Sequence, residues 1–281
     1  MIVKKSTMDL IGRIIVYALL IVVSVLFLLP FLWMVSTALK PIDKIFTIPP
    51  QFIPQTFMWQ NFTDAINAIP FWTYLSNTLI YAVFSMLGTV LSSTVIAYGF
   101  SRLRWKGRDT VFFIVLMTMM LPYQVTMIPL FIIFKNLGFI NTLLPLIVPS
   151  FFGVPFYIFL IRQFMMSIPK EMSEAARIDG ASEWGILWRI IVPITKPALW
   201  TVAIFQMIAA WQDFLGPLIY LSDESKYTMS LGLQQFQTAH GAIWNQLMAV
   251  SLIMTIPMIV LFFITQKALL EGLTLTGSIK A

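Results

Sequence analysis

The chain has 281 residues, of which 59% are hydrophobic and 11% are charged, and its formal net charge is +6. Soluble domains are roughly 45–50% apolar and about 25% charged, so this composition excludes an ordinary soluble domain, a disordered chain and a collagen-like fibre. Because the sequence contains no cysteine, a disulfide scaffold, a thiolate nucleophile and a thiolate metal site are excluded as well.

Six apolar runs are long enough to cross a bilayer, since a transmembrane helix needs roughly 20 mostly apolar residues. They cover residues 14–34, 77–100, 110–134, 143–165, 199–221 and 246–265. The first run follows basic residues, as the apolar core of a signal peptide does. Its length of about 21 residues exceeds the 7–15 residues of such a core, so it is interpreted as an uncleaved membrane span. We therefore expect an all-α integral membrane protein with six transmembrane helices in one domain, 1–281.

The distribution of Lys and Arg predicts the orientation, because cytoplasmic loops carry an excess of these residues. If the six runs cross in turn, only Lys40, Lys44, Lys135 and Lys226 of the 18 basic residues fall on one side, and the other fourteen fall on the opposite side. Both termini are therefore expected to be cytoplasmic. The net positive charge is interpreted as a topology signal, which argues against a nucleic-acid partner.

Two connections on the outer side are long. The segment 35–76 contains five prolines, which exclude a long continuous helix, and several aromatic residues that suit the membrane interface. It is interpreted as an anchored loop in preference to a ligand-binding one. The polar segment 222–245 is a candidate contact for an external partner, and its His240 is interpreted as a solvated loop residue.

The cytoplasmic connection 168–193 carries helix start and stop signals. Pro169 suits the first position of a short helix, and Gly180 suits the left-handed residue that ends it. Ser182 is a candidate N-cap for a second helix, which should stop before Pro193. Apolar side chains at i, i+3, i+4 and i+7 spacing are predicted to share one face of the second helix: Trp184, Leu187, Trp188 and Ile191.

This pattern predicts a helix–turn–helix that exposes charge. Ala175 and Ala176 are small enough to permit close approach, and Glu174 and Arg177 lie three residues apart on the helix surface. From these residues alone, two interpretations stay open: a partner-docking element, or an amphipathic helix lying at the membrane interface. A DNA-reading role is disfavoured because membrane spans flank the segment on both sides.

Polar residues inside apolar runs are expensive unless they face a cavity or a partner helix. In the fifth run Gln206, Asp213 and Tyr220 recur at seven-residue intervals, and Asp213 is the only acid in any of the six runs. The candidates for a polar path are Asn77, Tyr123, Gln124, Gln206, Trp211, Asp213 and Tyr220, with Ser150 and Gln163 as further members. The alternative is hydrogen bonding between helices. Helix kinks are expected at Pro122, Pro129, Gly216 and Pro217.

Several segments resemble a known family. Glu174-Ala175-Ala176, Asp179-Gly180-Ala181 and Val192-Pro193 resemble the EAA loop of ATP-binding-cassette (ABC) importer permeases. The likeness extends in order along the chain through 98–108, 137–142, 211–214 and 271–274, and it is strongest to the carbohydrate-uptake (maltose-type) branch and its smaller permease. Two departures are Gln212, where relatives often carry Asn, and a tail, 276–281, that is less glycine-rich.

The resemblance implies the binding-protein-dependent (MetI-like) permease fold in the cytoplasmic membrane of a bacterium or archaeon. It also implies partners: a second homologous permease, two copies of a cytoplasmic ATP-binding subunit and an extracytoplasmic solute-binding protein. The EAA loop would be a coupling helix that docks on the ATPase, and the tail from about 272 to 281 would reach toward the same subunits. The residues that the resemblance assigns to coupling are Glu174, Ala175, Ala176, Arg177, Asp179 and Gly180.

The sequence carries no catalytic equipment of its own. It has neither a phosphate-binding G-x-x-x-x-G-K-[ST] loop nor a G-x-G-x-x-G motif, and one histidine supports neither a His-based metal site nor a hydrolase triad. We expect no catalytic residue, cofactor or metal, and ATP hydrolysis in a partner. The expected cargo is a sugar or oligosaccharide. The alternatives are glycerol phosphate or a polyol carried by the same machinery, a self-sufficient secondary transporter or channel, and an intramembrane enzyme.

Overall fold

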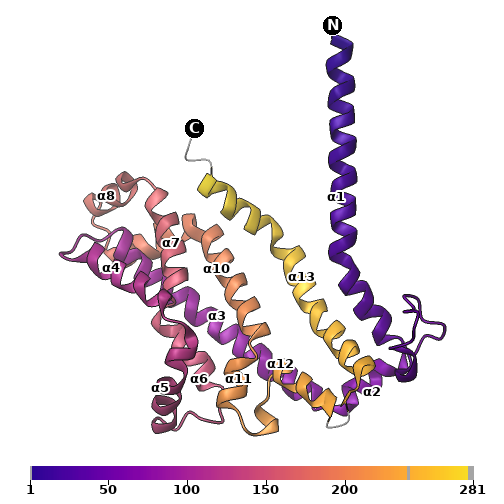
Figure 1. Ribbon diagram of the computed structural model, residues 1–281. Coiled ribbons are helices and arrows are strands. Elements are labelled where there is room, and N and C mark those ends of the chain that lie inside the picture. Colours follow the sequence, from indigo (N-terminus) through magenta and orange to yellow (C-terminus); the bar gives the residue numbers. More distant parts are fainter. Residues whose placement is uncertain (1, 239–240, 278–281) are drawn as a thin grey trace. The chain divides into compact units, whose positions relative to one another are not determined.

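The computed structural model describes residues 2–238 and 241–277 (Figure 1). The chain divides into two compact units, Met1–Ile69 with Gln235–Thr255, and Pro70–Gln234 with Ile256–Ala281. A single domain over 1–281 stays a prediction. His240 lies outside the described residues.

The first unit begins with α1 (Ile2–Ala38), in which the apolar segment Gly12–Ala38 is long enough to cross a membrane. The side chains of this segment are largely exposed, as expected of a helix that lipid surrounds. The first unit continues through η1 (Ile42–Lys44) and α2 (Gln60–Ala68). A two-stranded antiparallel sheet, β1 (Gln237–Thr238) with β2 (Gly241–Ala242), precedes α13 (Trp244–Gly277), which runs on into the second unit.

Buried amides hold the proline-rich segment together. The Asn61 amide donates to the carbonyls of Ala38 at 2.8 Å and Lys40 at 2.9 Å, and the Asn245 amide donates to Asn61 Oδ1 at 3.0 Å. The Lys40 ammonium donates to the Gln51 carbonyl, and burial lowers the pKa of Lys40. As the prolines predicted, no long helix forms between α1 and α3 (Phe71–Ser101).

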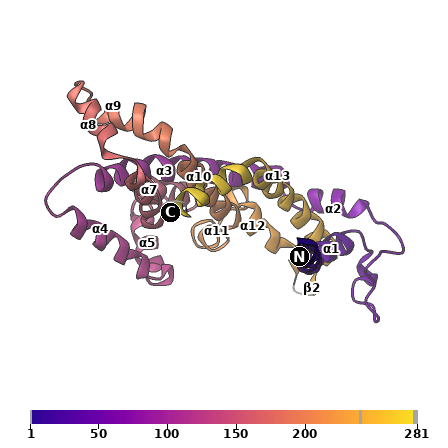
Figure 2. The same cartoon turned by 90° about the horizontal axis from the view of Figure 1, so that it is seen from above.

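The second unit is built around α3, against which α7 (Pro155–Ser167) and α10 (Val192–Gln212) pack (Figures 1 and 2). Small side chains along α3 permit this close packing. A Cβ at Gly88 would lie 2.5 Å from Ser150 Oγ in η3 (Val148–Phe152), so only glycine fits there. The remaining elements are α4 (Arg108–Met117), η2 (Thr118–Met120), α5 (Tyr123–Asn136), α6 (Leu144–Ile147), α8 (Lys170–Ile178), α9 (Glu183–Ile186), η4 (Leu187–Ile191), α11 (Leu215–Tyr220), η5 (Glu224–Lys226), α12 (Met229–Gly232) and η6 (Leu233–Phe236).

The apolar run 110–134 is not one straight helix. The helices Arg108–Met120 and Tyr123–Asn136 meet at 98°, because Leu121 is extended, as the residue before a proline tends to be, and Pro122 has no N–H to continue the helix. Within the described residues, five helices are long and apolar enough to cross a membrane, or six if this bent pair counts as one span.

The fifth run also differs from its predicted bounds, 199–221. The helix begins at Glu183 and ends at Gln212, after which Asp213 adopts an extended backbone and α11 follows. The sequence did not show that this helix begins at Glu183, because the charged residues Arg189 and Lys196 interrupt the apolar pattern. The fourth run is interrupted as well, since Gly153 (φ +88°) separates η3 from α7.

Candidate functional site

Residues 170–191, called the hairpin from here on, form two helical arms joined by a turn at Gly180. Gly180 has φ +81°; its N–H donates to the Arg177 carbonyl at 3.1 Å, and the Ala181 N–H donates to the Ala176 carbonyl at 2.9 Å. This paired arrangement is a Schellman C-cap, which places glycine in the left-handed conformation. The predicted helix end at Gly180 is confirmed.

The start of each arm follows from capping. The Ser182 hydroxyl accepts from the Gly185 N–H at 3.2 Å, which confirms it as an N-cap. Pro169 lies at the N-cap position of α8, one residue earlier than predicted. Its missing N–H is harmless there too, because the N-cap N–H takes no part in the helical ladder.

The second arm does not stop before Pro193, contrary to the prediction. It continues from α9 through the π-helical η4 directly into α10. The Val192 N–H bonds the Leu187 carbonyl in this wider turn, and Pro193, which has no N–H, follows where the wide turn returns to α-helical geometry. The hairpin is thus continuous with a membrane-spanning helix.

The predicted apolar face of the second arm is split. Leu187 and Ile191 are buried in the core formed with α3 and α7, whereas Trp184 and Trp188 are exposed. The wider π turn shifts the residues that follow it around the helix, so the i, i+3, i+4, i+7 pattern of a regular helix does not hold. The buried half anchors the hairpin to the bundle.

A polar network joins both arms of the hairpin to α3. Arg177 Nε lies 2.6 Å from Glu183 Oε1, and the Tyr98 hydroxyl donates to Glu183 Oε2 at 2.5 Å. The hydrogen bond that Arg177 donates to Glu183 raises the pKa of the Arg177 guanidinium. Tyr98 belongs to the end of α3, Arg177 to α8 and Glu183 to α9, so this network ties the first arm to the membrane bundle.

Two arginines fix the segment that enters the hairpin. Arg102 donates to the carbonyls of Met165 at 2.5 Å and Ile168 at 2.7 Å, which caps the end of α7, and burial lowers the pKa of Arg102. Arg162 donates in the opposite direction, to the Phe100 carbonyl at 3.2 Å. The ends of α3 and α7 are therefore held together at the point where α7 leads into the hairpin.

The residues expected to couple to an ATPase lie mainly on the exposed first arm and its turn. Glu174, Ala175, Asp179 and Gly180 are exposed, whereas Ala176 is half-buried against the core. Arg177 is committed to Glu183. Sequence reasoning missed Tyr98 and Glu183, which are 85 residues apart, and no local pattern marks such a contact.

Replacing Glu183 with glutamine is expected to loosen the first arm and to lower transport about fivefold, because a partly exposed ion pair contributes up to about 1 kcal/mol. Initial rates of solute uptake, normalised to the amount of protein in the membrane, measure the effect. Glu224→Gln, which removes an exposed acid of η5, should leave the rate unchanged. Uptake by Glu183→Gln at the unaltered rate would contradict a role for this pair.

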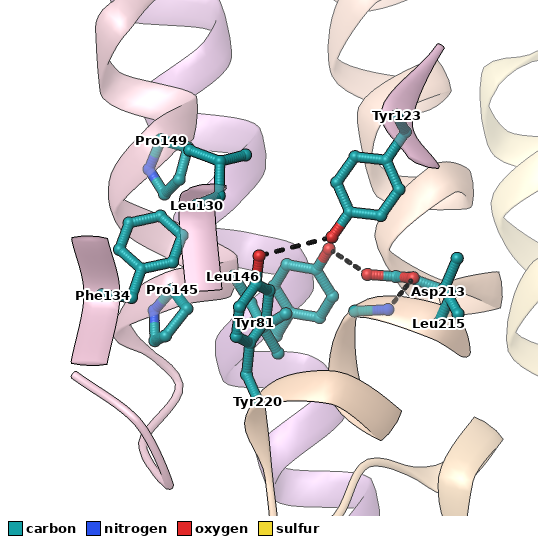
Figure 3. Close-up of a pocket in the computed structure, with 11 residues that line it drawn as sticks. Tyr81, Tyr123, Leu130, Phe134, Pro145, Leu146, Pro149, Asp213, Leu215 and Tyr220 are labelled. Carbon is teal, nitrogen blue, oxygen red and sulfur yellow. Dashed lines mark hydrogen bonds between the residues drawn. The ribbon is translucent and has the colours of Figure 1, made fainter. Parts of the chain in front are cut away.

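At the other end of this unit, α5, α6 and α11 border a cavity of about 330 Å³ (Figures 1 and 3). Figure 3 shows that Tyr81, Tyr123, Asp213 and Tyr220 point toward one another in it. The Tyr81 hydroxyl donates to Asp213 Oδ2 at 2.9 Å, and the hydroxyls of Tyr123 and Tyr220 are 3.4 Å apart. The remaining walls are apolar: Leu130, Phe134, Pro145, Leu146, Pro149, Leu215 and Gly216.

The break after α10 positions the carboxylate. Asp213 Oδ1 accepts from the Gly216 N–H at 3.0 Å, which stabilises the start of α11. A Cβ at Gly216 would lie 2.5 Å from Asp213 Oδ2, so glycine is needed for this close approach. The sharp bend at Pro122 brings Tyr123, the first residue of α5, to the same cavity.

Three of the seven residues predicted for a polar path meet in this cavity, namely Tyr123, Asp213 and Tyr220. The Asn77 amide instead donates to the carbonyls of Ser225 and Tyr227, each at 3.0 Å, and so holds an outer loop. Gln124 is exposed, Gln206 is half-buried and Trp211 is buried, and none of them lines the cavity. Tyr81 was missed, because one tyrosine in an apolar helix gives no distinguishing signal.

Residues 89–274 match the family described as "binding-protein-dependent transport system inner membrane component". The chain belongs to this family. The matched part of the permease includes the whole hairpin, Tyr98 and Asp213. Residues 272–277 belong to α13, and the rest of the tail expected to contact the ATPase, 278–281, lies outside the described residues.

Relatives match nearly the whole permease. It is 35% identical over 271 residues to the probable ABC transporter permease protein YurM of Bacillus subtilis, covering 96% of this chain and 89% of the relative. It is 32% identical to the trehalose/maltose transport system permease protein MalG of Thermococcus litoralis, with coverage of 97% and 98%. The resemblance drawn from the EAA loop is confirmed.

A solved structure supports the fold. A chain of a bacterial ABC transporter "involved in the import of the acidic polysaccharide alginate" superposes with a TM-score of 0.81 at 25% identity, covering 92% of this permease and 96% of that chain. The arabinooligosaccharides transport system permease protein AraQ of Bacillus subtilis is 31% identical, with coverage of 90% and 91%. The permease is therefore an all-α transport component of the ABC importer type.

Proposed function

We propose that this permease is one of two homologous membrane subunits of an ATP-driven importer for a sugar or oligosaccharide. Two copies of a cytoplasmic ATP-binding subunit supply the energy, and an extracytoplasmic solute-binding protein delivers the cargo. The chain itself is not an enzyme, and both of its termini face the cytoplasm. Relatives named for arabinooligosaccharide and trehalose/maltose transport support the cargo class.

The observation that carries the proposal is the construction of the hairpin. Its first arm exposes Glu174 and Ala175, as a docking surface requires, while its second arm buries Leu187 and Ile191 in the bundle and continues into α10. Movement of a docked ATPase is therefore transmitted to a membrane-spanning helix. An amphipathic helix that only lies on the membrane needs no such continuity, so the docking interpretation is favoured.

The cavity around Asp213 is proposed as a part of the translocation path. Its tyrosine hydroxyls and carboxylate suit a hydroxyl-rich solute, and its aromatic walls suit the apolar face of a sugar ring. Among the described residues, no Lys or Arg lines this cavity, which argues against glycerol phosphate. The alternative role of these polar groups is hydrogen bonding between helices, of which the Tyr81–Asp213 bond between α3 and the α10–α11 break is an example.

Co-purification of the full-length tagged chain from its native membranes tests this proposal. We expect a second permease and an ATP-binding subunit to accompany it, and Glu174→Lys to lose the ATP-binding subunit while still inserting in the membrane. Glu171→Lys is the matched control, because Glu171 is an exposed acid on the same helix and should retain that subunit. Recovery of the wild-type chain without any ATP-binding subunit would contradict the proposal.

A further inference from the structure

Two neighbouring hollows beside the hairpin have several cationic residues in their lining. The inner one, of about 40 Å³, is lined by Ser101, Arg102, Arg104, Arg108, Lys170, Ser173, Glu174 and Arg177. The outer one, of about 550 Å³, shares Arg104, Arg108 and Lys170 with it and adds Trp105, Gly107, Asp109 and Thr110. Together they are called the basic hollow. It shares Glu174 and Arg177 with the residues expected to couple to an ATPase, and it has no residue in common with the cavity around Asp213.

Buried polar atoms at the base of the basic hollow lack partners. Ser173 is 2% exposed and Arg102 is 8% exposed, yet Ser173 Oγ and Arg102 Nε form no hydrogen bond with any described residue. Buried polar groups are nearly always hydrogen-bonded, so unpartnered ones require an explanation. Both atoms are able to donate a hydrogen bond, which predicts an acceptor group in this hollow.

The rim of the basic hollow carries unneutralised positive charge. Arg104 and Lys170 are exposed and form no ion pair within the part of the chain that the structure describes. Asp109 is already engaged by Arg108 at 3.0 Å and by Arg162 at 3.7 Å. Glu174 is then the one remaining carboxylate among the lining residues. The chemistry of the site therefore favours an anion, which charge-assisted hydrogen bonds from Arg and Lys would bind.

The position of the basic hollow identifies the source of the anion. The hollow lies where α3 ends at Ser101, where α7 ends at Ser167 and where α4 begins at Arg108. Because Phe71–Ser101 and Leu144–Ser167 are long and apolar enough to cross a membrane, we expect their ends to lie at the level of the lipid headgroups. Directly beyond the hollow, α4 exposes Val111, Phe113 and Ile114, an apolar surface for acyl chains. Trp105 at the rim is exposed and is of the residue type enriched at membrane interfaces.

We propose that the basic hollow binds the phosphate group of an anionic phospholipid of the cytoplasmic leaflet. Arg104 and Lys170 hold the phosphate at the rim, Ser173 and Arg102 donate toward it from the base, and the acyl chains lie along α4. Because Lys170 and Ser173 belong to α8, the bound lipid connects the first arm of the hairpin to the loop 102–108. Basic pockets between transmembrane helices on this side of a membrane are known to suit anionic headgroups.

Native mass spectrometry of the full-length chain with its co-purifying subunits tests the proposal, with phosphatidylglycerol and phosphatidylcholine as the two probes. We expect phosphatidylglycerol to be retained selectively, and the double variant Arg104→Gln/Lys170→Gln to weaken its retention about 30-fold, since each basic residue near an anionic leaflet contributes about a fivefold preference. Retention of phosphatidylcholine should not change.

Three controls separate the outcomes. Arg189→Gln/Lys196→Gln removes two exposed basic residues of the second arm and α10 that do not line the hollow, and it should retain phosphatidylglycerol. Arg104→Lys/Lys170→Arg keeps both charges and should retain it too, so that a loss in the glutamine variant is attributed to the removal of charge. Millimolar inorganic phosphate should not displace the lipid.

The contrary results are equally specific. Equal retention of the two lipids, or full displacement by inorganic phosphate, would overturn the lipid assignment. If Arg104→Gln/Lys170→Gln kept phosphatidylglycerol but lost the ATP-binding subunit, the hollow would hold an acidic side chain of that partner, and the lipid proposal would be wrong. Loss of lipid with the ATP-binding subunit retained supports the proposal, and the hairpin's docking role is then unaffected.

Discussion

Replacing Gly180 with valine is expected to abolish solute uptake while the chain still inserts in the membrane. Gly180 has φ +81°, a conformation that is a severe outlier for a β-branched residue and costs of order 1–3 kcal/mol. A Cβ there would meet no atom within 4 Å, so the cost falls on the turn itself and not on packing. The two arms should then meet at a different angle, and the first arm should lose its docked position.

Gly185→Ala is the matched control for this variant, because Gly185 lies in the same hairpin but in a helix. A Cβ at Gly185 would meet only Ser182 Oγ, at an ordinary 3.4 Å, and alanine favours a helix. Uptake rate, quantity of membrane-inserted protein and co-purification of the ATP-binding subunit measure the effect. Normal uptake by Gly180→Val would count heavily against the turn as a coupling element.

Replacing Asp213 with leucine is expected to reduce uptake by at least about 30-fold. The change leaves the Tyr81 hydroxyl and the Gly216 N–H without their acceptor, and each unsatisfied buried polar group costs about 1–3 kcal/mol. It also removes the carboxylate proposed to contact the solute. The break between α10 and α11, which the carboxylate stabilises, should become less well defined.

Asp213→Asn separates charge from geometry. The amide oxygen of asparagine still accepts from the Gly216 N–H, and the side-chain volume is similar. We expect it to retain more transport than Asp213→Leu, with a loss below about tenfold. Tyr81→Phe removes only the hydroxyl that donates to Asp213 and should fall between the wild type and Asp213→Leu. Uptake by Asp213→Leu at the wild-type rate would exclude the cavity from the path.

The parts of the fold that depend on local chemistry were predictable from the sequence. Gly180 and Ser182 mark the turn of the hairpin because helix caps depend on a few adjacent residues. Hydrophobic runs of sufficient length predicted the membrane segments, of which the described residues form five, or six with the bent pair. Their breaks were harder to place: Pro122 was recognised as a kink, but nothing in the sequence fixes an angle of 98°.

The parts that depend on distant contacts were not predictable. Tyr98 meets Glu183, and Tyr81 meets Asp213 across 132 residues, and no sequence periodicity connects such pairs. The spacing of Gln206, Asp213 and Tyr220 assumed one continuous helix, whereas the chain breaks at Asp213. Asp213 and Tyr220 still line one cavity, because α11 turns back beside α6.

Energy coupling through the hairpin is the central claim, and reconstitution tests it most directly. The full-length chain is purified alone and placed in liposomes, and flux of the sugar that its membrane complex imports is measured with and without a sugar gradient. The account predicts no flux by the chain alone, and ATP-dependent uptake only when its partner permease, the ATP-binding subunit and the binding protein are added. Sugar flux through the chain by itself would contradict it.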